Sequence, residues 1–168
     1  MECFFCEVLN KKVGVFEVYE NENFLAFVDA FPFVPGQIVI ITKKHSFSFI
    51  NFEIFSKDFF DVIKKIVTSF LNLGYDGYHL LINEGSAATF DHFYCILIPR
   101  KKDDGFSFNL KKLNLNEKQM SEISELIKKN IKEEEKVAEE KKEEKEEKEK
   151  VEDVEEVRRF LEKIKRIP

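Results

Sequence analysis

Apolar and polar positions alternate in short runs through the first 115 residues, and turn-forming residues separate these runs. Runs rich in β-branched and aromatic residues predict five strands, at residues 16–20, 24–30, 38–42, 78–84 and 92–99. Between the third and the fourth, apolar residues recur at helical spacing over residues 53–73 and predict one long helix. A short helical entry is expected over residues 3–10. This order of elements predicts an α+β domain over residues 1–115.

The remaining residues follow a different pattern. Asn116 is expected to cap a helix over residues 116–131, whose apolar positions are Met120, Ile123, Leu126, Ile127 and Ile131. Residues 132–150 are almost all charged, so we expect a frayed helix or a solvated linker there. A terminal amphipathic helix of the kind found in coiled coils is expected over residues 151–168, with its apolar side formed by Val151, Val154, Val157, Leu161 and Ile164.

Composition narrows the classes of protein that remain. The net charge of -5 argues against nucleic acid as a partner. No apolar run approaches the roughly 20 residues of a membrane helix, and the N-terminus lacks a basic leader, so we expect a cytoplasmic protein without a membrane partner. In a reducing compartment the close pair Cys3 and Cys6 is interpreted as metal ligands or as a redox pair.

Several motifs, taken in order, resemble the histidine-triad (HIT) family. The segment from Asn83 to Arg100 resembles the family signature, in which Asn-x-Gly precedes three alternating histidines. Residues 24–29, Pro35-Gly36 and residues 40–45 resemble its first half, and Cys3-x-x-Cys6 resembles the opening of its zinc-containing branch. The resemblance covers roughly residues 3–105 and implies a HIT-like fold, with an antiparallel sheet of about five strands, and a homodimer.

A zinc site is the first consequence of this resemblance. The zinc-bearing relatives hold the metal with four residues, and all four positions match here: Cys3, Cys6, His45 and His92. Two thiolates and two imidazoles form a closed tetrahedral set, which suits a structural Zn²⁺ and leaves no open position for a substrate. The alternative is that these cysteines and histidines are unrelated to one another.

The catalytic part of the family pattern is degenerate in this chain. The second histidine of the triad is the nucleophile in the family, and its position is Tyr94. The third position is Ile96, whose side chain cannot form a hydrogen bond. The Gly-Gln phosphate turn is also missing, although Thr89 can still donate one hydrogen bond. The chain is therefore not expected to be an active hydrolase, and no catalytic residue is assigned.

A nucleotide-binding role remains open beside a purely structural one. By resemblance, Asp29 would accept hydrogen bonds from the ribose hydroxyls of a purine nucleotide, and Asn83, Gly85 and Thr89 would lie at its phosphate end. Phe27, Phe31 and Phe5 would supply an apolar slot for the purine ring. Alternatively, these phenylalanines are core residues and Asp29 merely ends a strand. The leading hypothesis is a catalytically degenerate nucleotide-binding or regulatory module. The alternatives are a weak nucleotide hydrolase or phosphoramidase, and a zinc-stabilised scaffold that binds a protein partner through its C-terminal helix.

Overall fold

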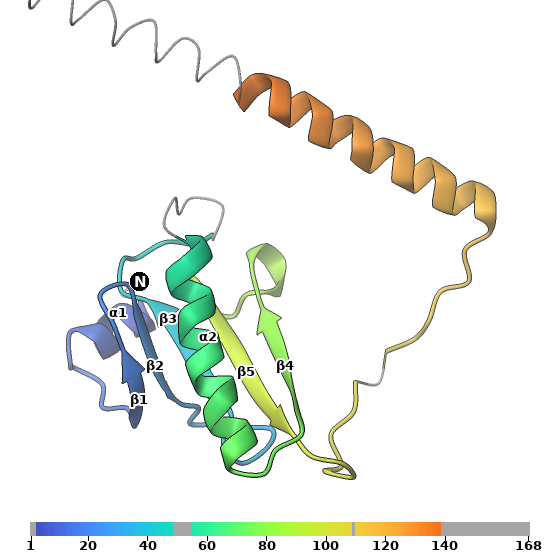
Figure 1. Ribbon diagram of the computed structural model, residues 1–168. Coiled ribbons are helices and arrows are strands. Elements are labelled where there is room, and N and C mark those ends of the chain that lie inside the picture. Colours follow the sequence, from blue (N-terminus) through green and yellow to red (C-terminus); the bar gives the residue numbers. More distant parts are fainter. Residues whose placement is uncertain (1–2, 49–54, 109, 139–168) are drawn as a thin grey trace, which may run out of the picture. The chain divides into compact units, whose positions relative to one another are not determined.

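The protein is described by a computed structural model that covers residues 3–48, 55–108 and 110–138 (Figure 1). The chain divides into two compact units, Met1–Asn109 and Leu110–Pro168. The first unit contains α1 (Phe4–Leu9), β1 (Glu17–Glu20), β2 (Phe24–Val28), β3 (Ile38–Thr42), α2 (Phe55–Asn72), β4 (Gly77–Ile82), the 3₁₀ turn η2 (Gly85–Ala87) and β5 (Tyr94–Arg100).

The five strands form one antiparallel sheet in the order β1-β2-β3-β5-β4. The predicted α+β class, with five antiparallel strands and one long helix, is thereby confirmed. Strands β3 and β5 lie side by side although α2 and β4 separate them in the sequence, with Ile41 opposite Tyr94. This pairing brings the loop that follows β3 close to the residues that precede β5.

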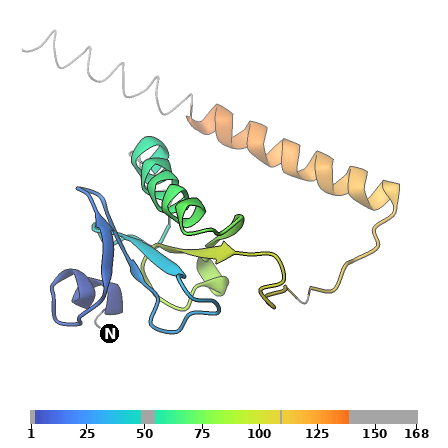
Figure 2. The same cartoon turned by 60° about the horizontal axis from the view of Figure 1, so that its bottom comes forward.

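The two faces of the sheet are covered by different helices (Figure 2). Side chains on one face pack against α2 and form a hydrophobic cluster of buried residues, which includes Phe59, Val62, Ile66, Phe93, Cys95 and Leu97. The other face packs against α1, and this second cluster contains Phe5, Val8, Leu25, Phe27, Val39, Ile41 and Tyr94. Because successive residues of a strand point to opposite faces, Cys95 and Tyr94 belong to different clusters. Cys95 is buried on the face away from Tyr94.

Turn chemistry explains where the elements end. The side-chain oxygen of Asn21 accepts hydrogen bonds from the amides of Asn23 and Phe24, at 3.0 and 2.7 Å, and so closes the turn between β1 and β2. Gly74, two positions after the last residue of α2, adopts a φ of +80°, and this left-handed conformation ends the helix. Gly36 has a φ of +86° in the β2–β3 loop, and a Cβ there would approach the hydroxyl of Tyr75 to 3.1 Å.

The second unit contains a helix over residues 117–138. Asn116 and Gln119 form a reciprocal cap, in which each side-chain oxygen accepts the backbone N–H of the other residue, at 2.9 and 3.0 Å. The helix extends into the predicted charged stretch. The rest of that stretch, residues 139–150, and the predicted terminal helix over residues 151–168 lie outside the described residues. Within the described part of the chain, no helix is long and apolar enough to cross a membrane.

Candidate functional site

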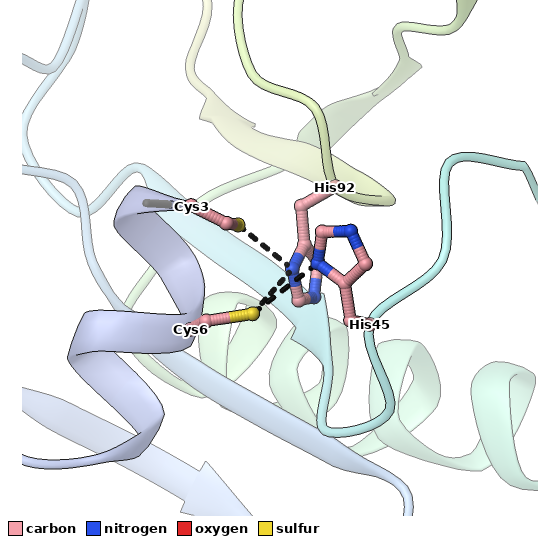
Figure 3. Close-up of side chains that lie close together, drawn as sticks. All are labelled: Cys3, Cys6, His45 and His92. Atoms are coloured by element: carbon pink, nitrogen blue, oxygen red, sulfur yellow. Dashed lines mark hydrogen bonds between the residues drawn. The ribbon is translucent and has the colours of Figure 1, made fainter. Parts of the chain in front are cut away.

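Two cysteines and two histidines from distant parts of the sequence meet at one end of the sheet (Figure 3). Their ligand atoms all lie within 4.8 Å of one another: Cys3 Sγ, Cys6 Sγ, and one ring nitrogen each from His45 and His92. The separations from Nδ1 of His92 are 3.3 Å to Cys3 Sγ and 3.8 Å to Cys6 Sγ. Nδ1 of His45 lies 3.2 Å from Cys6 Sγ. The structure thus brings together the four residues expected to bind zinc.

Local structure explains why these side chains converge. Cys3 is the N-cap residue of α1, and Cys6 follows nearly one turn later, so both thiols lie on the same side of this short helix. His45 lies in the loop that leaves β3. His92 was expected within the fifth strand, but β5 begins only at Tyr94, because the amide of His92 bonds to the carbonyl of Phe90 in the preceding turn. His92 therefore reaches the thiols from a turn.

The ring of His92 is fixed by Thr42. His92 is 1% exposed, and its Nε2 lies 2.8 Å from the carbonyl oxygen of Thr42 and 3.2 Å from the Thr42 hydroxyl. A carbonyl can only accept, so Nε2 carries the proton and Nδ1 presents a lone pair to the thiols. Burial also lowers the pKa of His92. A neutral imidazole that is oriented by a carbonyl is the usual form of a metal-binding histidine.

Burial lowers the pKa of His92 but raises the pKa of the Cys6 thiol, because in both cases it disfavours the charged form. Desolvation and the neighbouring Cys3 raise the pKa of Cys6, because a second thiolate beside the first is unfavourable. A divalent cation between the thiols would reverse this preference and hold both of them as thiolates.

The spacing of the four ligand atoms can be compared with a tetrahedral site. Around Zn²⁺, bonds of about 2.1 Å to nitrogen and about 2.3 Å to sulfur place neighbouring ligand atoms about 3.4–3.8 Å apart. The three separations given above, 3.2, 3.3 and 3.8 Å, are close to this range. The geometry and the donor types therefore fit a tetrahedral metal ion, with small adjustments of the side chains.

Aromatic side chains adjoin the metal ligands on the same face of the sheet. Phe5 lies between the two cysteines in the sequence, and its ring contacts that of Phe4 at a centroid distance of 5.5 Å. Its centroid also lies 4.7 Å from Phe90, 5.4 Å from Tyr94, 5.6 Å from His92 and 6.3 Å from Phe27. The backbone N–H of Thr89 donates to the hydroxyl of Tyr94 at 3.2 Å. Thr89 lies in the segment where the family resemblance would place the phosphate turn, and here its amide is bonded to the hydroxyl of Tyr94.

The other residues expected to contact a nucleotide lie in two separate loops, the one between β2 and β3 and the one that follows β4. Asp29 accepts hydrogen bonds from the amide of Phe31 at 2.9 Å and from Nε2 of Gln37 at 2.6 Å, so it also organises the loop between β2 and β3. Phe31 is 91% exposed and lies outside the aromatic cluster. Asn83 is half-buried after β4, and Gly85 begins η2 with a φ of +57°.

Three residues of the site were not singled out from the sequence, namely Thr42, Gln37 and Phe90. Gln37 and Thr42 are buried polar residues at the two ends of β3, and in the sequence they are ordinary neighbours of an apolar run. Phe90 is one of 19 phenylalanines, so composition alone could not distinguish it. His79 is half-buried and forms a hydrogen bond with Arg100.

Comparison with known proteins adds family information to this geometry. The HIT domain model matches residues 11–103. An uncharacterized HIT-like protein of Borreliella burgdorferi is 34% identical over 77% of this chain and 99% of its own length. An adenosine 5'-monophosphoramidase of Candida albicans is 29% identical over 60% of this chain and 72% of its own length.

Two solved structures are similar in fold and in sequence. A HIT family protein from Bacillus subtilis aligns with a TM-score of 0.68 and 26% identity, over 77% of this chain and 96% of its own. A Zn-bound histidine triad family protein from Mycobacterium smegmatis aligns with a TM-score of 0.53 and 26% identity, over 67% of this chain and 85% of its own.

Proposed function

The chain belongs to the HIT family, and from this premise we propose that it is a zinc-stabilised module that binds a purine nucleotide without hydrolysing it. The proposal has three parts, which are the metal, the loss of catalysis and the retained ligand. The observation that carries it concerns Tyr94, which by the family resemblance stands where the nucleophile would be: its side chain is buried and its hydroxyl accepts a hydrogen bond from the amide of Thr89.

The zinc part rests on Cys3, Cys6, His45 and His92. Their donor types and spacing suit Zn²⁺, and a related HIT structure is Zn-bound. A closed set of four protein ligands leaves no coordination position for a water molecule, so such a metal would stabilise the fold rather than activate a nucleophile. It would tie the start of α1 to the loops that follow β3 and precede β5.

The loss of catalysis follows from the chemistry of Tyr94. A phenol has an ordinary pKa of about 10 and attacks phosphorus poorly without a base beside it. The side chain that lies nearest along the same face of β5 is Ile96, which offers no proton acceptor. The hydroxyl of Tyr94 instead accepts a hydrogen bond from the turn before β5. In this arrangement Tyr94 supports the turn, and no residue is assigned as a nucleophile.

Retention of a nucleotide is supported by the aromatic cluster and by Asp29. Phe90 is 36% exposed and packs on the buried Phe5 with ring centroids 4.7 Å apart, so Phe90 offers apolar surface of the kind that accepts a purine ring, with Phe5 and Phe27 behind it. A carboxylate has about four acceptor positions, so Asp29 can accept ribose hydroxyls in addition to its two loop contacts. The Candida relative named for adenosine 5'-monophosphoramidase activity points to the same class of ligand.

Two measurements test the proposal. Metal analysis of the purified protein should find close to one equivalent of zinc, whereas a content below a few tenths would contradict the metal part. Calorimetric titration with adenosine monophosphate should show saturable binding. A nucleotide that lacks both ribose hydroxyls should bind about tenfold more weakly, and the variant Asp29→Asn should lose this discrimination. No heat at several temperatures would contradict the nucleotide part.

A weak phosphoramidase is the second candidate, because one relative carries that activity in its name. In that case Tyr94 would have to take part in the reaction, and the variant Tyr94→Phe should abolish turnover of an adenosine phosphoramidate. Turnover that survives in this variant would show that the site is assigned wrongly. The homodimer implied by the family resemblance remains a prediction, and light scattering of the intact chain would test it.

A further inference from the structure

The helix over residues 117–138 presents an apolar side that the second unit does not cover within its described residues. Met120, Ile123, Leu126, Ile127 and Ile131 recur at helical spacing, and each is between 47 and 61% exposed. In proteins, most of the stability of a helix comes from packing an apolar side against a partner rather than from intrinsic helix propensity. We therefore expect another segment or molecule to pack on this apolar side.

We propose that the C-terminal segment, residues 151–168, folds back as a helix and packs antiparallel on the apolar side of helix 117–138. The proposal concerns the second unit alone and does not depend on the nucleotide or on the metal. The segment is the natural candidate because its own apolar side, with Val154, Val157, Leu161 and Ile164, also needs a partner. One hairpin would cover both apolar sides.

The lengths of the two apolar sides agree. At about 1.5 Å per residue, Met120 to Ile131 extends about 17 Å and Val151 to Ile164 about 20 Å. The described helix continues seven residues beyond Ile131. In the proposed hairpin, the last seven of the 12 residues 139–150 would form helix alongside the seven residues that follow Ile131. Five residues would then form the turn, which is within the usual length of helix–helix connections, about 2–8 residues.

The distribution of charged residues along both segments favours antiparallel over parallel packing. Residues 117–125 contain three acidic residues and one lysine, whereas residues 126–132 contain three lysines and no acidic residue. The C-terminal segment has the same polarity, with four acidic residues over 152–156 and five basic residues against one acidic residue over 158–166. Antiparallel packing therefore places acidic beside basic at both ends, and parallel packing places like charges together.

A second copy of helix 117–138 is the main competing occupant. Two copies packed antiparallel would also match acidic with basic ends, but they would leave the apolar side of residues 151–168 uncovered. A segment joined by a short connection is present at an effective concentration in the millimolar range, which exceeds that of a second chain in dilute solution. Both considerations favour the segment of the same chain.

Hydrogen exchange of the full-length protein, followed by mass spectrometry, tests this packing. Amides over residues 117–131 and 151–164 should be protected, and the variant Leu161→Asp should reduce protection over 117–131 about tenfold or more. The matched control Glu162→Asp changes a neighbouring residue expected on the outer side, and it should have little effect. Absence of protection in the wild-type protein, or protection that survives Leu161→Asp, would overturn the proposal.

Cross-linking distinguishes the possible occupants. A mixture of ordinary and ¹⁵N-labelled full-length protein, treated with a carbodiimide, should yield links between lysines of 128–132 and carboxylates of 152–156. These links should join peptides of the same isotope, and their yield should be unchanged by dilution. Mixed-isotope links that weaken on dilution would assign the apolar side to a second copy and overturn the proposal. Links from the lysines of 128–132 to Glu162, which lies within the basic stretch 158–166, would instead indicate parallel packing and overturn the antiparallel direction.

Discussion

Replacing Phe5 with alanine should destabilise the first unit far more than the same change at the adjacent Phe4. Phe5 is 3% exposed and its ring contacts five other rings, whereas Phe4 is 40% exposed. Truncating a fully buried phenylalanine typically costs about 3–5 kcal/mol, because apolar contacts are lost and a cavity remains. Phe4 has two ring contacts, to Phe5 and to Phe90, each with centroids 5.5 Å apart, and for this half-exposed side chain we expect a cost of about 1 kcal/mol.

The magnitude translates into a measurable change in melting temperature. In a domain of about 100 residues, each kcal/mol lowers the Tm by about 4–8 °C, so Phe5→Ala should lower it by about 12 °C or more. Urea unfolding of both variants would give the free energies of unfolding directly. The two substitutions are identical in chemistry and adjacent in sequence, so a difference between them reports burial alone.

Phe5→Ala should also weaken metal binding. Phe5 lies between Cys3 and Cys6 on α1 and anchors this six-residue helix to the sheet. Loosening the helix removes the preorganisation of both thiols, and changes outside the ligands commonly reduce zinc affinity about 10–100-fold. Competition with a chromophoric chelator measures this affinity. The reasoning would be refuted if Phe5→Ala cost no more stability than Phe4→Ala, or if the two variants bound zinc equally well.

Three further predictions follow from other parts of the first unit. Gln37→Met should cost about 2–4 kcal/mol in urea unfolding, because it removes a charge-assisted hydrogen bond to Asp29 and a neutral one to the β2–β3 loop; a cost below about 1 kcal/mol would contradict this. Gly36→Ala should lower the Tm, because φ is +86° and the added Cβ would meet a tyrosine hydroxyl at 3.1 Å, whereas an unchanged Tm would show that the loop adapts. The Arg100 guanidinium holds the pKa of Asp104 well below its usual range, so its contribution to stability is complete above about pH 4 and decreases as the pH falls through the lower, folded-state pKa. Asp104→Asn should accordingly flatten the loss of stability below about pH 4 and leave its pH dependence between 5 and 7 unchanged, as acid unfolding monitored by circular dichroism can show.

The sequence alone determined the class of fold and the types of residue in the metal site. Alternation with a period of two and recurrence with a period of 3.6 are local properties, and for this reason the five strands and the long helix could be predicted with small errors at their ends. The four metal ligands could be proposed because short motifs carry them and because their resemblance to a family supplied the connection between those motifs. The strand boundary at His92 was placed wrongly, because the hydrogen bond from its amide to Phe90 depends on the conformation of the turn.

Only the tertiary structure decided which residues meet. Cys3 and His92 are 89 positions apart, and they approach because β5 pairs with the distant strand β3 as well as with β4, its neighbour in sequence. The same pairing sets Thr42 behind the ring of His92. Contacts of this kind depend on strand order and on long-range packing, for which no local pattern exists. The sequence could therefore name the metal ligands, whereas the orientation of those ligands, and the residues that support them, follow from the assembled sheet.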